Sequence, residues 1–254
     1  MLEIVQVPIL GDNYAYLLHE PEEGATAVVD PGEAAPLLAA AEARGWRIDK
    51  VLLTHHHADH VAGAAGVREA TGAAVVAPLA DLGRIENVDV AVADGETVAL
   101  GATHAVVFET PGHTSGHVAY WFMADDALFP GDTLFALGCG RLFEGTPEQM
   151  WESLSRLRAL PDETRVFCGH EYTAANARFA RALDPDNAEL AARAEEIARL
   201  VETRQPTVPS LLGVEKATNP FLRADDAALA QRLGLAGHPP AAVFAEIRRR
   251  KDTF

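Results

Sequence analysis

Four short apolar runs of the chain each end at a residue that can bind a metal ion. The runs are KVLLT before His55, HAVVFETPG before His113, ALFPG before Asp132 and RVFCG before His170. Apolar runs of this length, bounded by Gly, Pro and Asp, are typical of strands. Proteins that mix strands and helices tend to build their sites at the carboxyl ends of strands. Because the pattern occurs four times, it indicates a metal site and not an isolated coincidence.

The first of these strand ends carries four histidines and an aspartate in THHHADH, residues 54–60. His55 and His57 are two residues apart, so in extended backbone they point the same way while His56 points elsewhere. Asp59 and His60 follow at the start of an expected helix and can reach a second point in space. Since one ion would use only His55, His57 and one further ligand, the remaining pair indicates a second ion nearby.

Without His56, which points elsewhere, the four strand ends together supply five histidines and two aspartates. Two ions of tetrahedral to five-coordinate geometry need about that many donors if a carboxylate and a water bridge them. A histidine-rich surface loop is the alternative for THHHADH alone, but crowded neutral imidazoles have few uses other than metal binding.

A metal-bound hydroxide is the expected nucleophile. The chain has no G-x-S-x-G elbow, and neither Cys139 nor Cys168 has a convincing dyad partner in the sequence. Bound Zn²⁺ lowers the pKa of water from about 15.7 to about 7. Asp59 can accept a hydrogen bond from this hydroxide while it binds metal. A thiolate leaving group suits such a site, because it leaves without a general acid.

The organisation of the chain changes near residue 171. Strand-like runs mixed with helical segments such as 33–44 fill the part before it, whereas helices are expected over 187–204, 223–233 and 240–251. We therefore expect a mixed domain of strands and helices followed by a small helical domain. The pattern alone is compatible with a parallel sheet or with a sandwich that carries outer helices.

The composition limits the classes of binding partner and the cellular compartment that we expect for this chain. The 254 residues contain 21 Lys and Arg against 37 Asp and Glu, and 21 − 37 gives a net charge of −16. So acidic a chain is unsuited to binding nucleic acid over a broad face. No apolar run is long enough to span a bilayer, MLEIVQVPIL lacks the features of a signal peptide, and two cysteines suit a reducing cytosol. We expect a cytoplasmic protein that binds neither membrane nor nucleic acid.

The ordered motifs THHHADH, TPGHTSGH, FPGDTLF and FCGHEYT resemble those of the metallo-β-lactamase superfamily. GCGRLFEGT, GHEYT and the terminal RRRKDTF resemble one of its members, the hydroxyacylglutathione hydrolase (glyoxalase II) family. The resemblance runs from PILGDNYAYLL to the last residue. It implies an α+β fold, with an αββα four-layer sandwich as the catalytic domain over residues 1–170 and a small α-helical domain that binds the glutathione substrate over residues 171–254.

The resemblance also implies two divalent metal ions per chain, with zinc expected and iron or manganese as alternatives. Asp59 and Asp132 would be the catalytic aspartates, and Asp30 would support the site without binding metal. The implied ligands are His55, His57 and His113 for one ion, Asp59, His60 and His170 for the other, and Asp132 as the bridge between them.

The implied activity is hydrolysis of S-(2-hydroxyacyl)glutathione thioesters, such as S-D-lactoylglutathione, to glutathione and D-lactate, the second step of methylglyoxal detoxification. The protein is expected to act as a monomer on this small molecule. Some family members have Lys and Tyr where this chain has Arg141 and Phe143, and the Phe offers only its ring and backbone. The residues that the resemblance implies for glutathione binding are Arg141, Phe143, Tyr172, Arg248 and Lys251.

Two other functions are open at this point. A glutathione persulfide dioxygenase of the same superfamily would need a single iron at His55, His113 and Asp132. A non-catalytic metal-binding protein would bind metal without turnover. The helical C-terminal region that ends in RRRKD favours the hydrolase, while lactonase and β-lactamase activities are weaker alternatives because they require no glutathione clamp.

Overall fold

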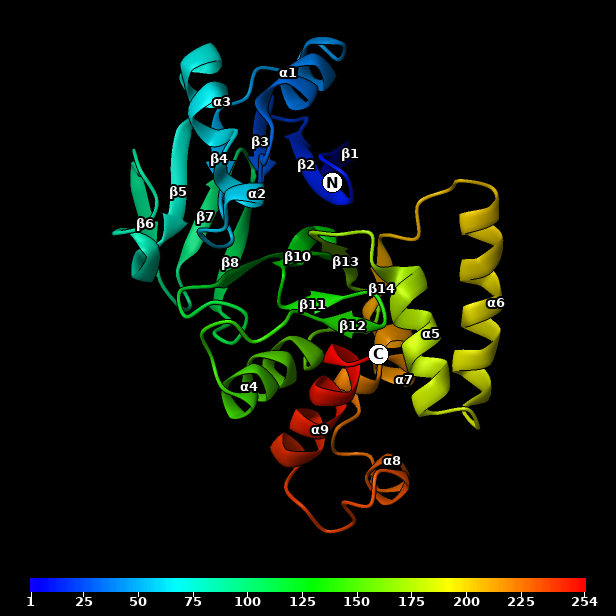
Figure 1. The fold of residues 1–254 in the computed structure, drawn as a ribbon. Coiled ribbons are helices and arrows are strands. Elements are labelled where there is room, and N and C mark those ends of the chain that lie inside the picture. Colours follow the sequence, from blue (N-terminus) through cyan, green and yellow to red (C-terminus); the bar gives the residue numbers. More distant parts are fainter. The chain divides into compact units, whose positions relative to one another are not determined.

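The computed structural model describes all 254 residues, which divide into two compact units. Unit 1 comprises Met1–Glu109 and Gly116–Gly131, and unit 2 comprises Thr110–Ser115 and Asp132–Phe254. No helix is both long enough and apolar enough to cross a membrane. Figure 1 shows the elements of each unit.

Unit 1 contains a six-stranded sheet whose strands follow one another in chain order. The first three strands are antiparallel, and the later ones add in parallel. Parallel neighbours need crossover connections, and helices supply most of these. The strands are β1 (Glu3–Ile9), β2 (Asn13–Glu20), β3 (Ala25–Val29), β4 (Lys50–Leu52), β5 (Ala74–Pro78) and β6 (Val90–Val92), and the connecting helices are α1 (Ala34–Glu42), α2 (Ala58–Val61), α3 (Ala64–Thr71) and the 3₁₀ turn η1 (Leu79–Asp81).

One face of this sheet packs against α1 and α3, which lie together beside the strands in Figure 1. Val28, Val51 and Val75 from neighbouring strands join Leu37 of α1 and Val67 of α3 in one buried cluster. The three valines occupy equivalent positions in the strand register. The periods of 2 for strands and 3.6 for helices therefore direct these side chains to a common core.

The other face of the sheet packs against a second sheet, whose strands in unit 1 are antiparallel. The ring of Tyr16 on β2 meets the ring of Phe129 edge to face, with centroids 5.4 Å apart. The hydroxyl of Tyr120 donates a 2.9 Å hydrogen bond to the carbonyl oxygen of Leu53. The second sheet's elements in this unit are β7 (Thr97–Leu100), β8 (Thr103–Glu109), β9 (Val118–Phe122), the 3₁₀ turn η2 (Met123–Asp125) and β10 (Ala127–Gly131).

Unit 2 is mainly helical, and it also holds two strands that pair with each other and a short hairpin. Helices α5 and α6 pack side by side, and α9 packs against α4 (Figure 1). The elements are β11 (Leu134–Phe135), β12 (Gly138–Cys139), α4 (Pro147–Arg158), β13 (Arg165–Cys168), α5 (Thr173–Leu183), α6 (Ala188–Glu202), β14 (Ser210–Leu211), α7 (Leu212–Thr218), η3 (Pro220–Leu222), α8 (Ala227–Arg232) and α9 (Pro240–Asp252).

The helices expected over 33–44, 187–204 and 240–251 are confirmed as α1, α6 and α9. The helix expected over 223–233 begins later, at Ala227, because the side chain of Asp226 caps its amino terminus. The strand β14 was not expected, since two residues are too few to give a periodic signal.

We predict that Gly63→Ala lowers the melting temperature. An added Cβ would lie 2.5 Å from the carbonyl oxygen of Pro31 and 2.6 Å from the backbone nitrogen of Ala34. Backbone atoms cannot move aside easily, so the overlap should cost about 2 kcal/mol, which corresponds to roughly 4–8 °C. Gly83→Ala is the matched control, because nothing lies within 4 Å of its added Cβ. Equal melting temperatures for the two variants, measured by calorimetry, would contradict this account.

Candidate metal centre

The histidine stretch of unit 1 runs from the end of β4 into α2. His57 is the N-cap of α2, and Asp59 and His60 lie in its only turn. The ring centroid of His55 is 4.7 Å from that of His57 and 4.2 Å from that of His60. His56 instead places its Nδ1 3.2 Å from the buried carboxylate of Asp81. The stretch therefore gathers its other three imidazoles and holds His56 apart.

Asp30, directly after β3, anchors this stretch. Its buried carboxylate accepts hydrogen bonds from the backbone nitrogen of Thr54 at 2.8 Å and from the Thr54 hydroxyl at 2.7 Å. It also accepts one from Nδ1 of His60 at 3.0 Å. The Thr54 hydroxyl in turn lies 3.0 Å from Nδ1 of His55. A histidine that donates through Nδ1 presents the lone pair of Nε2, which is the form that binds metal.

Unit 2 supplies the other candidate ligands. Oδ2 of Asp132 lies 3.4 Å from Nε2 of His113 and 3.4 Å from Nε2 of His170. Nδ1 of His113 donates to the carbonyl oxygen of Arg141 at 2.9 Å. The ring of His170 stacks on that of Tyr172, with centroids 4.6 Å apart. These contacts direct both Nε2 atoms toward the carboxylate that the sequence predicted as a bridge.

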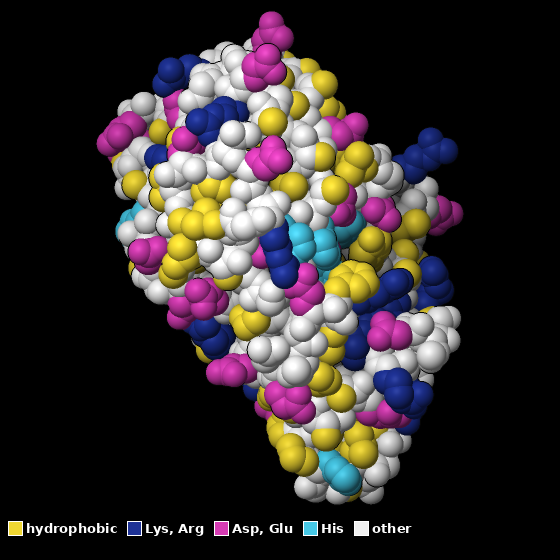
Figure 2. All heavy atoms as spheres, turned by 60° about the vertical axis from the view of Figure 1, so that its left-hand side comes forward, with side chains coloured by type: hydrophobic (Ala, Val, Ile, Leu, Met, Phe, Trp, Pro, Cys, Tyr) yellow, Lys and Arg dark blue, Asp and Glu magenta, His cyan; other side chains and the backbone are white.

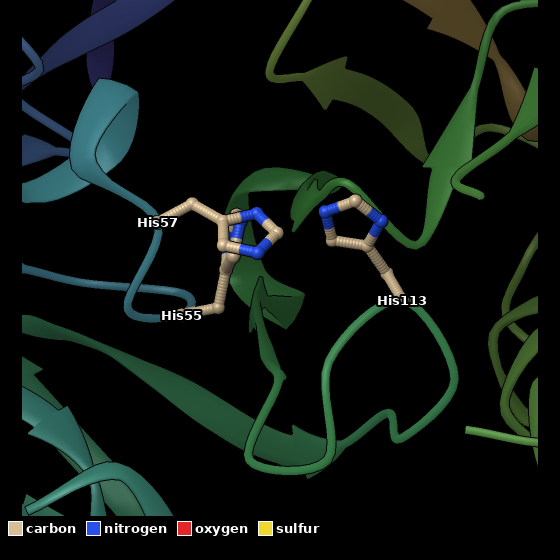
Figure 3. Close-up of side chains that lie close together, drawn as sticks. All are labelled: His55, His57 and His113. Atoms are coloured by element: carbon tan, nitrogen blue, oxygen red, sulfur yellow. The ribbon is translucent and has the colours of Figure 1, made fainter. Parts of the chain in front are cut away.

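The structure brings the seven predicted ligands together in overlapping groups of three. Within each group the ligand atoms all lie within 4.8 Å of one another. Figure 3 shows one group, with the three imidazole rings turned toward one another. Histidine side chains also reach the surface on the face in Figure 2. The groups are His55 with His57 and His113, His55 with His60 and Asp132, and Asp59 with His60 and His170.

These groups fit divalent metal ions. Their donors are imidazole nitrogens and carboxylate oxygens with no thiolate, a set that zinc, iron and manganese all accept. Protein acceptors hold Nδ1 of His55, His60 and His113, so the Nε2 atoms are preorganised for coordination.

The two cysteines do not compete for the role of nucleophile. Both are buried and free of disulfide bonds. Burial raises the pKa of Cys139 to about 11 and that of Cys168 to about 12. Both are therefore neutral thiols at pH 7, and a thiol is a much poorer nucleophile than a thiolate.

Three of the predicted substrate-binding residues are exposed in the structure. Arg141 and Phe143 lie in the loop after β12, and Phe143 is 61% exposed. The Phe143 ring lies 5.2 Å from that of His113. Tyr172, which stacks on His170, is exposed as well. Aromatic rings therefore flank two of the candidate ligands.

The two predicted residues of α9 differ from each other. Arg248 is only 6% exposed, and its guanidinium donates to the carbonyl oxygen of Cys139 at 3.0 Å and to Asp252 at 3.0 Å. Lys251 is half-buried, with Nζ 3.5 Å from the carbonyl oxygen of Ala175. Arg248 thus already has internal partners, whereas Lys251 keeps most of its hydrogen-bonding capacity.

Sequence reasoning did not identify the residues that hold the β11–β12 hairpin. Glu215, buried on α7, accepts from the backbone nitrogen of Leu137 at 2.9 Å and forms a buried ion pair with Arg193. Asn219 donates to the carbonyl oxygens of Phe135 and Gly138 at 3.2 and 3.1 Å. The one signal in the sequence was a charged residue, Glu215, on a helix face whose other positions are buried. Residue spacing does not reveal which groups such a charge contacts.

Comparisons with known proteins identify the family of this chain. The model of the metallo-β-lactamase superfamily matches residues 9–170, and the model of the hydroxyacylglutathione hydrolase C-terminus matches residues 171–254. A hydroxyacylglutathione hydrolase of Methylococcus capsulatus is 60% identical, covering 100% of this chain and 99% of that protein. The chain belongs to the hydroxyacylglutathione hydrolase family.

Further relatives are consistent with this assignment. A hydroxyacylglutathione hydrolase of Cereibacter sphaeroides is 54% identical, covering 100% of this chain and 99% of that protein. The solved structure of TTHA1623 in a di-iron-bound form is 29% identical, with a TM-score of 0.63, and covers 86% of this chain and 100% of that one. The chain therefore has the metallo-β-lactamase fold with a C-terminal helical domain, as the resemblance of its motifs implied.

We predict that Asp30→Asn weakens metal binding about 10- to 100-fold, the usual effect of losing a residue that orients a ligand. The amide cannot accept from both Thr54 and His60 as the carboxylate does, so the His60 ring loses its fixed orientation. Metal affinity, measured by competition with a chelator, checks this directly. The matched control is Asp125→Asn, a buried carboxylate of the same unit that accepts from Leu2 and Thr103. If both variants bind metal as wild type does, Asp30 does not orient the site.

Proposed function

We propose that this protein hydrolyses S-(2-hydroxyacyl)glutathione thioesters, with S-D-lactoylglutathione as substrate and glutathione and D-lactate as products. This is the second step of methylglyoxal detoxification. The full-length match to curated hydroxyacylglutathione hydrolases carries the proposal, and the gathered His and Asp side chains supply the metal-binding groups that such a reaction needs. The same relatives give no support to a persulfide dioxygenase.

The proposed centre holds two divalent ions, with zinc as the first expectation and iron or manganese as alternatives. His55, His57 and His113 would bind one ion, and Asp59, His60 and His170 the other. Asp132 would bridge them, since its carboxylate already lies 3.4 Å from imidazoles assigned to both ions. The di-iron-bound relative supports the count of two. When bound, the ions would supply a hydroxide at neutral pH and polarise the acyl carbonyl.

The chain's own residues orient the reactants. Asp59 accepts a 2.9 Å hydrogen bond from the amide of Asn13, which fixes the carboxylate so that it can accept a hydrogen bond from the attacking hydroxide. A thiolate of glutathione leaves without protonation, and this removes the need for a general acid. Asp59 and Asp132 are therefore the proposed catalytic aspartates.

Residues 171–254 form the proposed glutathione-binding domain, which follows a catalytic domain of residues 1–170. Arg141, Phe143, Tyr172 and Lys251 would contact the tripeptide, because the structure leaves them exposed or half-buried. Arg248 would contribute mainly by fixing the backbone at Cys139, two residues before Arg141. We also propose a cytoplasmic monomer that binds neither membrane nor nucleic acid. The net charge of −16 and the two free cysteines support that proposal.

The decisive experiment is hydrolysis of S-D-lactoylglutathione with metal analysis of the same sample. Wild type should cleave the thioester and hold two ions per chain. Asp132→Ala should lose at least about a hundredfold in kcat/KM and most of its bound metal, because a bridging ligand serves both ions. A fully active Asp132→Ala enzyme would exclude the bridging role. One iron per chain together with oxygen uptake would favour a dioxygenase, and bound metal without turnover would favour a non-catalytic protein.

Lys251→Ala should raise KM about tenfold and change kcat by less than about twofold, because a charge-assisted contact to the substrate carboxylate acts on binding. Arg249→Ala is the matched control, since Arg249 lies on the same helix but is paired with Glu246. Steady-state kinetics distinguish the two. An unchanged KM for Lys251→Ala would remove Lys251 from the substrate site.

A further inference from the structure

Arg178 on α5 is an exposed cation that the proposed function does not use. It forms no hydrogen bond and no ion pair in the structure, and its side chain is open to solvent. Several other arginines of unit 2 are paired with carboxylates. Arg158 binds Asp225 at 2.6 Å, and Arg223 binds Asp184 at 2.6 Å.

Arg178 lies beside Lys251 of α9. Arg178 and Phe179 lie three and four residues after Ala175, about one helical turn further along α5. Nζ of Lys251 lies 3.5 Å from the carbonyl oxygen of Ala175 and 5.4 Å from the ring centroid of Phe179. The ammonium group therefore contacts the turn of α5 from which Arg178 extends.

Four cations act on one another at this place. The pKa of Lys251 is lowered, first by burial and then by the positive charges of Arg248, Arg178 and Arg141. Asp252 is the one acidic group that opposes this effect, and it is bonded to Arg248. Apart from the ion pair of Arg248 with Asp252, these cations have no acidic partner, and like charges held close together cost free energy. Such an arrangement indicates an anionic ligand that offsets the repulsion.

The surroundings of Arg178 leave room for a ligand. Its side chain lines a groove of about 610 Å³ on α5 and α6, and the other charged residues of that groove are Arg181 and Glu202. Acidic side chains are spread over much of the face in Figure 2, as expected for a net charge of −16. With two arginines against one glutamate, the groove is a local exception to the negative charge of the chain.

We propose that Arg178 is a specificity-determining residue that binds one of the two carboxylates of the glutathione carrier, so that the site selects thioesters whose thiol portion bears both carboxylates. This inference rests on the proposed function. Glutathione carries one carboxylate on its glycine and one on its γ-glutamyl residue, at opposite ends of the tripeptide. Lys251 and Arg178 together can serve both ends, whereas a single cation cannot distinguish a dicarboxylate from its monoamide. Specificity then arises from the difference in affinity between the two.

The test compares three substrates with three enzymes. The substrates are S-D-lactoylglutathione, the same thioester with the glycine carboxylate converted to an amide, and the same thioester with the γ-glutamyl α-carboxylate converted to an amide. The enzymes are wild type, Arg178→Gln and Arg199→Gln. Arg199 on α6 is the matched control, because it is also exposed and unpaired but does not act on Lys251.

Arg178→Gln should raise KM for the parent substrate about five- to tenfold with kcat changed by less than about twofold. It should also abolish the discrimination of wild type against one of the two amides and leave the other unchanged. Arg178→Lys should recover part of the loss, and Arg199→Gln should behave as wild type. An unchanged KM, an equal increase for all three substrates, or the same effect in Arg199→Gln would overturn the inference, since the last two would indicate a general effect of charge.

Glutathione binding, measured by calorimetry on the metal-loaded protein, separates this inference from the proposed function. If wild type does not cleave the thioester but Arg178→Gln weakens glutathione binding about five- to tenfold, the proposed function fails and the role of Arg178 stands. If wild type cleaves the thioester and Arg178→Gln affects neither binding nor KM, the role of Arg178 fails and the proposed function stands. If neither turnover nor an effect on binding is observed, both fail.

Discussion

The carboxylate of Asp30 is the interaction on which the arrangement of the histidine stretch depends. It lies at the end of β3 and fixes the backbone at Thr54, at the end of β4. It also reaches His60 directly and His55 through the Thr54 hydroxyl. A buried carboxylate is costly unless it is fully hydrogen-bonded, and here each of those hydrogen bonds orients a candidate ligand. The same contacts thus satisfy the buried charge and preorganise the imidazoles.

A second buried carboxylate plays a comparable part in unit 2. Glu215 is paired with Arg193 and accepts from the backbone of the β11–β12 hairpin, while Asn219 holds two further carbonyl oxygens of that hairpin. Asp132 precedes the hairpin and Arg141 follows it. Removing one partner of such a pair leaves an uncompensated buried charge. The helices after residue 170 therefore help to shape the segment that carries a metal ligand and a proposed substrate contact.

The sequence was enough to find the candidate ligands that lie close together in the structure, because strand ends make them local features. THHHADH follows β4, Asp132 follows β10 and His170 lies close after β13, so an apolar run and the next polar residue were enough to find each one. The burial of Arg248 and the hydrogen bond from the Leu137 backbone to Glu215 could not be predicted. Both depend on contacts between segments about 80 to 110 residues apart. The strand β14 was missed because its two residues pair with β13 only after the chain has folded.

The positive charges of unit 2 fall into two classes with different physical roles. Arg193 and Arg248 are buried and form hydrogen bonds within the protein, so their charge contributes to the stability of the fold. Arg141 and Arg178 are exposed and unpaired. A chain of net charge −16 repels an anionic substrate at long range, and salt screens that repulsion over about 10 Å. Binding of an anionic substrate must then depend on cations in direct contact with it. Unpaired cations are therefore better guides to the binding surface than the total charge of the chain.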